Sequence, residues 1–148
     1  MGSAPAVERI ARFEAGEVPA AFGHRDHIAI CWDLLEVYGL LDTLVRLPAA
    51  LRRIVAAAGV PDKFNATQTA CWILLVAERK AGAASVEALL SAHPELFTDL
   101  PRQRYGAALH DPRWKRRFLP PPEPVELEVV PPPPLVSASV NTASRPSP

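Results

Sequence analysis

The chain has 148 residues, of which 49% are hydrophobic and 22% charged, so it can bury a core of its own without the help of disulfides. Its 16 Lys and Arg residues balance 16 Asp and Glu residues, and this zero net charge argues against nucleic-acid binding. Because no apolar run reaches the length of a membrane span and no secretory signal opens the chain, we predict a soluble cytoplasmic protein that does not bind membranes.

The two cysteines agree with that location. Cys31 and Cys71 each lie within an apolar run, which predicts two free, buried thiols in a reducing compartment. The sequence leaves the oligomeric state open, with a homodimer among the options.

The first predicted elements are a short helix and a core helix. Residues 5–14 are expected to form an amphipathic helix with Val7 on its apolar side. Residues 24–38 carry apolar side chains at helical spacing, and Gly39 is expected to end that helix. The charged residues of the core helix, Asp33 among them, are expected to face solvent.

Two further helical patterns follow. Residues 41–58 have a helical pattern that Pro48 is expected to divide, because proline lacks an amide donor. A mostly apolar helix is predicted over 65–80, where Asn65 and Gln68 resemble a capping box.

The remaining part of the domain predicts short helices and no strands. Helical turns are expected near residues 86–90, 101–109 and 112–118, and no run alternates with a period of two. We therefore predict an all-α, compact bundle of about five to seven helices over residues 1–119. Ten of the 17 prolines lie in residues 120–148, which predicts an extended, disordered Pro-rich tail.

The start of the core helix carries the clearest candidate site. At about 100° per residue, His24 and His27 both project toward the inside of the bundle. One such histidine is equally well explained as a neutral core residue bonded to a carbonyl or hydroxyl, but two in one turn favour a polar pocket. Because imidazole titrates at about pH 6.5, a small shift lets it act as an acid or a base. We predict His24 and His27 as the catalytic pair.

A metal site is the competing interpretation of these histidines. His24 and His27 supply two ligands, whereas zinc-type sites need at least three from the protein. His93 and His110 lie at predicted helix ends, where capping and loop roles are expected. We therefore predict neither a metal nor a cofactor.

A second polar patch opens the helix predicted over 65–80. Asn65, Thr69 and Trp72 share a face of it, and they would meet the histidines if the two helices pack side by side. In the simpler alternative, Asn65 only caps the helix, Thr69 bonds the backbone and Trp72 is plain core. The predicted substrate-binding residues are Asp26, Cys31, Trp32, Phe64, Asn65, Thr67, Thr69 and Trp72.

The motifs carry a family resemblance. Phe22, His24 and His27 form a Phe-x-His-x-x-His motif, and Thr67 and Thr69 follow after a long gap. This arrangement resembles a group of small, mostly uncharacterised bacterial all-helical proteins with that motif and a Tyr-His-Glu-Thr-x-Thr motif. The resemblance spans about residues 13–124 and implies that the two histidines, and more weakly the two threonines, are shared site residues.

The second motif is degenerate in this chain. Where the similar proteins have histidine and glutamate, this chain has Asn65 and Ala66. The resemblance therefore implies a retained pocket with altered chemistry.

The absence of nucleotide-binding, serine-hydrolase and Cys-x-x-Cys motifs excludes those enzyme classes. We predict a cofactor-independent biosynthetic enzyme that cyclises, condenses or isomerises a small organic substrate, for example by a Pictet–Spengler-type ring closure. The alternative is a noncatalytic helical module that binds a small molecule, a carrier or a partner protein. A metal-dependent or scaffolding role is the remaining option.

Overall fold

The computed structural model describes residues 2–121 of the chain. Within that range the backbone forms α-helices and short 3₁₀-helices and no β-strand, which confirms the predicted all-α bundle. The predicted tail lies outside the described residues, apart from its first two positions. None of the helices in the described range is long and apolar enough to cross a bilayer. In chain order the elements are α1 (Ala4–Glu14), α2 (His24–Ala57), η1 (Pro61–Lys63), α3 (Ala66–Lys80), α4 (Val86–Ala92), η2 (Pro94–Phe97), α5 (Leu100–Tyr105), η3 (Gly106–His110) and α6 (Pro112–Arg116).

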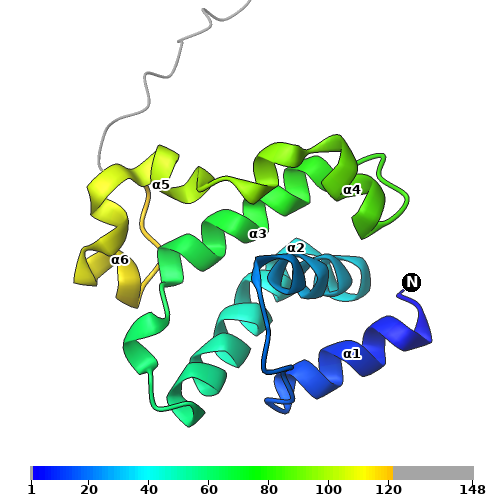
Figure 1. Cartoon of the computed structure of the whole chain (residues 1–148), viewed down its shortest axis with the longest axis horizontal. Helices are drawn as coiled ribbons and strands as arrows, with labels where there is room; N and C mark the ends of the chain where they lie inside the picture. The colour runs from blue at the N-terminus through cyan, green and yellow to red at the C-terminus, as the bar shows by residue number, and fades with distance from the viewer. Residues whose placement is uncertain (1, 122–148) are drawn as a thin grey trace, which may run out of the picture.

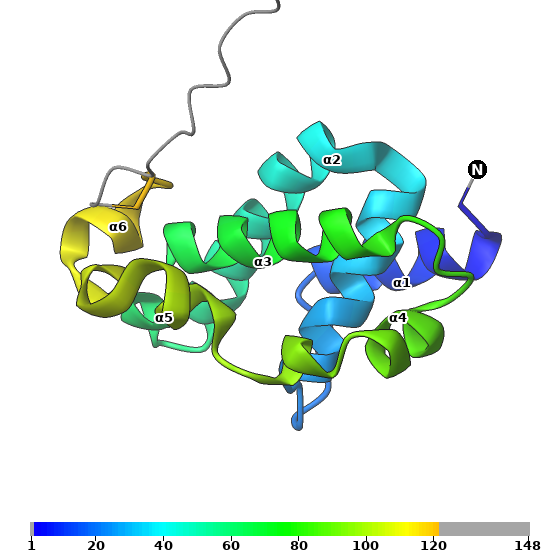
Figure 2. The ribbon, with the colours of Figure 1, turned by 90° about the horizontal axis from the view of Figure 1, so that it is seen from above.

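The long helix α2 consists of two arms that meet at Gly39. Gly39 has φ 76° and ψ −178°. Glycine adopts this backbone conformation readily, whereas the Cβ of any other L-residue would clash there. The first arm of α2 ends at Gly39, as predicted. The chain changes direction there and then continues as the second arm (Figure 2). The hydroxyl of Thr43 donates a hydrogen bond to the Gly39 carbonyl oxygen at 2.7 Å and adds a side-chain bond at the bend.

The predicted break at Pro48 is wrong. The second arm of α2 continues through Pro48 to its end, and Gly39 is the one residue of α2 with non-helical dihedral angles. A proline inside a helix costs about 3 kcal/mol because it lacks an amide donor. Leu47 and Ala50, on either side of Pro48, are 4% and 1% exposed, and their burial offsets this cost.

Helices α1 and α3 lie on opposite sides of α2 (Figure 1). The contact with α1 includes a two-pronged ion pair, in which Nε and Nη2 of Arg9 donate to the two carboxylate oxygens of Asp33 at 2.7 Å. The expectation that Asp33 faces solvent is therefore wrong, because Arg9 neutralises a carboxylate that is only 6% exposed. On α1 itself, Ile10 and Phe13 are buried as their spacing predicts, but Val7 is exposed and the neighbouring Ala6 is buried in its place.

The core has two parts. The larger part fills the space between α1, α2, α3, α4 and η2. The smaller part lies under α5, η3 and α6, which cover the N-terminal end of α3 in Figure 1. Members of the larger part include Ile10, Leu34, Ile73, Leu89 and Leu96, and the smaller part contains Cys71, Tyr105, Leu109 and Trp114.

Candidate functional site

A cavity of about 360 Å³ lies between the two arms of α2 and α3. Because α2 bends at Gly39, residues from both of its arms border this one hollow. The walls are mainly apolar, with two histidines and the polar start of α3 among them. The lining residues are Phe22, Gly23, His24, His27, Ile28 and Cys31 from the first arm and the loop before it, Leu47, Leu51 and Val55 from the second arm, and Lys63, Phe64, Asn65, Gln68, Thr69, Trp72 and Val76 from α3 and the loop before it.

The cavity brings together most of the predicted site. The predicted residues that border it are His24, His27, Cys31, Phe64, Asn65, Thr69 and Trp72. The packing of α2 beside α3 therefore joins the histidine pair and the polar patch, as the helical periodicity predicted. Asp26, Trp32 and Thr67 do not border it.

The ring of His24 is held by a backbone carbonyl and by an indole. Its Nε2 lies 2.6 Å from the carbonyl oxygen of Leu96, and its centroid lies 4.5 Å from that of the Trp72 ring. Because a carbonyl oxygen only accepts, Nε2 carries the proton and donates it. In the neutral ring Nδ1 then holds a lone pair, and no residue in the range 2–121 forms a hydrogen bond with it.

The ring of His27 has the opposite tautomer. Its Nδ1 donates to the carbonyl oxygen of Gly23 at 2.9 Å, so the neutral ring has its lone pair at Nε2. The Phe22 ring packs edge-on against it at 4.5 Å. Burial lowers the pKa of His27 below its ordinary value, and the nearby imidazole of His24 lowers it further, while the bond to Gly23 acts in the opposite direction. His27 is therefore a neutral base at neutral pH.

The polar groups at the start of α3 are already bonded inside the protein. Asn65 accepts from the amide of Gln68 at 3.0 Å and donates through Nδ2 to the carbonyl oxygen of Leu109 at 2.7 Å. The hydroxyl of Thr69 donates to the Asn65 carbonyl oxygen at 2.8 Å. The simpler alternative for these two residues, capping and backbone bonding, thus describes their contacts, although both also border the cavity. Among the predicted site residues at the cavity, the histidines are left as the groups with open proton-transfer positions.

Two of the predicted residues outside the cavity belong to α2. The carboxylate of Asp26 accepts from the amide of Gly23 at 2.8 Å and so caps the helix. Trp32 is buried in the larger core, and Nζ of Lys80 lies 4.4 Å from its ring centroid. The structure therefore places neither predicted residue at the cavity. Their neighbours Cys31 and His27 lie about 100° away around the helix and border it instead.

Thr67 is the third residue outside the cavity. Its hydroxyl donates to the carbonyl oxygen of Arg117 at 3.1 Å and accepts from the amide of Leu119 at 3.2 Å. Thr67 lies about 200° around α3 from Thr69, so the two threonines face opposite sides. Thr67 therefore holds the segment after α6 against α3 and has no place in the cavity.

Sequence reasoning missed the wall formed by the second arm of α2. Leu47, Leu51 and Val55 border the cavity at a spacing of four residues, which is a helical-face signal that could have been found. The carbonyl of Leu96, which orients His24, could not have been found this way, because a backbone oxygen is present at every residue.

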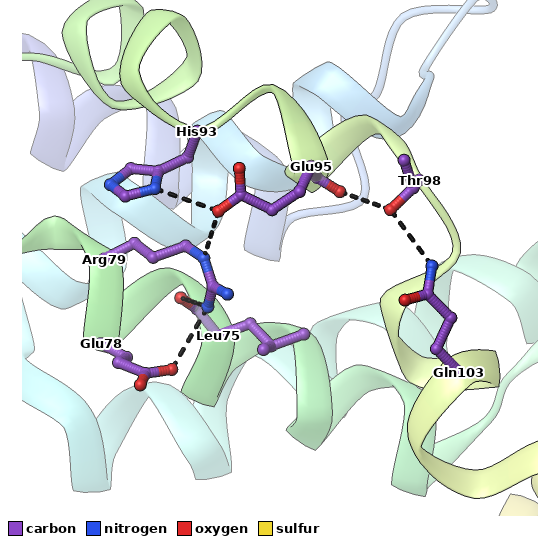
Figure 3. A network of polar contacts seen from close by, with 7 residues as sticks. All are labelled: Leu75, Glu78, Arg79, His93, Glu95, Thr98 and Gln103. Atoms are coloured by element: carbon purple, nitrogen blue, oxygen red, sulfur yellow. Dashed lines mark hydrogen bonds and ion pairs between the residues drawn. The ribbon is translucent and has the colours of Figure 1, made fainter.

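An ion-pair network holds the turn that carries Leu96. Nε of Arg79, on α3, donates to Oε1 of Glu95 at 2.9 Å, and Nδ1 of His93 lies 3.1 Å from the same oxygen (Figure 3). The bond from Arg79 lowers the pKa of the Glu95 carboxyl to about 2, so the pair is charged at neutral pH. Because Glu95 and Leu96 are adjacent in η2, the network fixes the carbonyl that orients His24.

Cys31 forms part of the cavity wall, and its thiol does not act as a nucleophile. Burial raises its pKa to about 12, so it stays protonated at neutral pH. Among residues 2–121 no three His, Cys, Asp or Glu side chains gather closely enough to hold a metal ion.

Comparison of the chain with models of protein families, with curated proteins and with solved structures finds no match.

Proposed function

We propose that this protein is a small, cofactor-independent biosynthetic enzyme that uses His24 and His27 to cyclise, condense or isomerise a small organic molecule in the cavity. The observation that carries the proposal is the tautomer arrangement: each imidazole donates one N–H to a backbone carbonyl and keeps its other nitrogen open. A cytoplasmic location, and kinship with the small bacterial helical proteins described above, belong to the same proposal.

The two histidines have different roles in the proposed reaction. His27 has a lowered pKa and accepts a proton at Nε2. His24 delivers a proton from Nδ1 once that nitrogen is protonated, while its Nε2–H remains bonded to Leu96. Burial is the main cause of the lowered pKa of His27, and the neighbouring imidazole of His24 lowers it further.

A Pictet–Spengler-type ring closure fits these roles. The substrate's imine nitrogen takes a proton from His24, the ring carbon attacks the iminium carbon, and His27 removes the proton whose loss restores aromaticity. The aromatic part of the substrate would lie against Trp72 and Phe64, both at the cavity wall. No redox step or cofactor is needed, because the imine and the ring-closed product are isomers.

Nitrogen NMR of the histidine side chains tests the carrying observation directly. We expect the Nε2–H form for neutral His24 and the Nδ1–H form for neutral His27. Finding the same tautomer in both rings would remove the basis for assigning them separate roles.

Turnover is tested with tryptamine and a panel of short aldehydes, by chromatographic separation of the imine from its ring-closed isomer. We expect ring closure above the buffer rate, and a loss of roughly 10²–10⁴-fold in His27→Gln and in His24→Gln. Arg102→Gln, a change at an exposed residue of α5 that does not border the cavity, is the control. Equal rates in wild type and both variants would contradict acid–base catalysis of this reaction.

One observation favours a noncatalytic binding module as the second candidate. Asn65 and Thr69 use their polar groups within the protein, so few groups remain to orient a reacting molecule. A binding module predicts that aromatic amines shift the NMR signals of Trp72 and His24 without being converted. It also predicts that His27→Gln changes the dissociation constant only modestly, because the contact with Phe22 and Trp72 would supply most of the affinity.

A further inference from the structure

A second, more open hollow lies directly beside the cavity. This basic groove has a volume of about 560 Å³ and lies between the end of α2, η1 and α6. Val55 and Phe64 border both the groove and the cavity, so the two hollows share a wall. The two hollows are therefore direct neighbours.

Cations outnumber carboxylates among the side chains of the basic groove. Three of its nine lining residues are cationic, namely Arg52, Lys115 and Arg116, and the remaining ones include one carboxylate, that of Asp62, and the imidazole of His110. None of the four charged side chains forms an ion pair with another residue between positions 2 and 121. The groove thus carries an excess of positive charge that the described part of the protein does not neutralise.

Arg52 is held in place at the wall between the two hollows. Its Nη2 donates to the carbonyl oxygen of Arg116 at 3.1 Å, and its guanidinium carbon lies 4.7 Å from the centroid of the Phe64 ring. One of its five N–H donors is engaged, and the others remain for a ligand. An arginine fixed on an aromatic ring loses little freedom when it binds a planar or tetrahedral anion.

We propose that the basic groove binds the phosphate group of a substrate whose apolar part occupies the cavity. Because three cations border the groove together with the Asp62 carboxylate, a doubly charged phosphate matches its positive charge better than a ligand with a single carboxylate does. Arginine also binds phosphate oxygens through paired N–H donors. This inference rests on the proposed function, because it takes the cavity as the site of the substrate's reacting part. The substrate class is then an aryl or alkyl phosphate.

The first experiment measures inorganic phosphate binding to the full chain by NMR titration at constant ionic strength. We expect signals of Lys115, Arg116 and Arg52 to shift together, and the dissociation constant to rise roughly tenfold or more in Lys115→Gln/Arg116→Gln. The matched control is Arg102→Gln/Arg104→Gln, which removes the same charge from exposed residues of α5 that do not border the groove. An equal effect in the control variant, or no shift at the groove, would overturn the proposal.

The second experiment compares naphthyl phosphate with inorganic phosphate and with naphthol. We expect naphthyl phosphate to bind more tightly than either, and to shift signals of both Lys115 and Trp72. Binding no tighter than that of inorganic phosphate would show that the two hollows do not act together and would overturn the proposal.

Two further outcomes separate this inference from its alternatives. The acidic residues Glu123, Glu126 and Glu128 follow the groove in sequence; if phosphate binds only after all three are changed to Gln, the chain's own tail is the ligand and the proposal falls. If naphthol shifts His24 and Trp72 while neither phosphate binds, the inference fails and the proposed function of the cavity stands.

Discussion

Replacing Asn65 with alanine tests how the cavity wall is built. Asn65 makes two bonds from one side chain: it caps α3 at the amide of Gln68 and donates to the carbonyl oxygen of Leu109. Loss of an N-cap costs about 1 kcal/mol. Loss of a buried donor, which leaves the Leu109 carbonyl unpaired, costs about 2 kcal/mol. We therefore expect Asn65→Ala to lower the free energy of unfolding by about 3 kcal/mol.

Urea unfolding followed by far-UV circular dichroism measures this change. Ser85→Ala is the matched control, because the Ser85 side chain caps α4 at the amide of Ala88 and makes no second bond in the range described; it should cost about 1 kcal/mol. Asn65→Asp keeps the capping oxygen but lacks the donor, and its carboxylate would face the Leu109 oxygen. It should cost about 2 kcal/mol or more.

The order of the three variants in their free energy of unfolding tests whether Asn65 stabilises the fold through two separate bonds. If Asn65→Ala costs no more than Ser85→Ala, the bond to Leu109 contributes nothing to stability and the division into two contributions is wrong. If Asn65→Asp is as stable as wild type, the donor has no role and Asn65 is only a cap.

The other predictions concern pH and the end of the fold. Because the folded pKa of Glu95 is lowered to about 2, its contribution to stability should be complete above pH 4.5 and disappear as the pH falls toward 2; thermal melts of Glu95→Gln should be less sensitive to acid over that window. Because the pKa of His27 is lowered, the folded state resists its protonation, so stability and ring closure should both fall as the pH drops below 6.5, and His27→Gln should remove the stability part of that dependence. Truncation after residue 121 should leave the thermal midpoint within a few degrees of wild type, whereas truncation after residue 116 removes the bonds of Thr67 and should lower it clearly; equal midpoints for the two truncations would show that the segment after α6 does not stabilise the domain.

The helices were predictable because their signals are local. Apolar spacing, the cap at Asn65 and the glycine at position 39 each act within one turn, and the structure has helices or a bend at these places. Pro48 was misread because a local rule about a missing donor competes with burial on both sides, which depends on neighbouring helices. Asp33 was misread for the same reason, since its partner Arg9 belongs to another helix.

The candidate site was predictable in part. Periodicity alone brought His24, His27 and Thr69 to one side, because α2 and α3 each present a single face to the other. Periodicity could not predict the contact of His24 with the Leu96 carbonyl or the existence of the basic groove. Both form between chain segments that are far apart in the sequence.

The bend at Gly39 makes the width of the cavity a property of one residue's backbone. Because both arms of α2 border the hollow, one continuous helix supplies two of its walls, and α3 with its preceding loop supplies the rest. Apart from the adjoining backbone of α2, no described atom lies within 4 Å of the place where a Cβ at residue 39 would be, so the dihedral angle restricts that position and packing does not. A D-amino acid there would keep the angle, and an L-amino acid would strain it. The walls that carry His27 and Leu51 are thus placed opposite each other by a bend within a single helix, which is how so short a chain can enclose a space for a ligand.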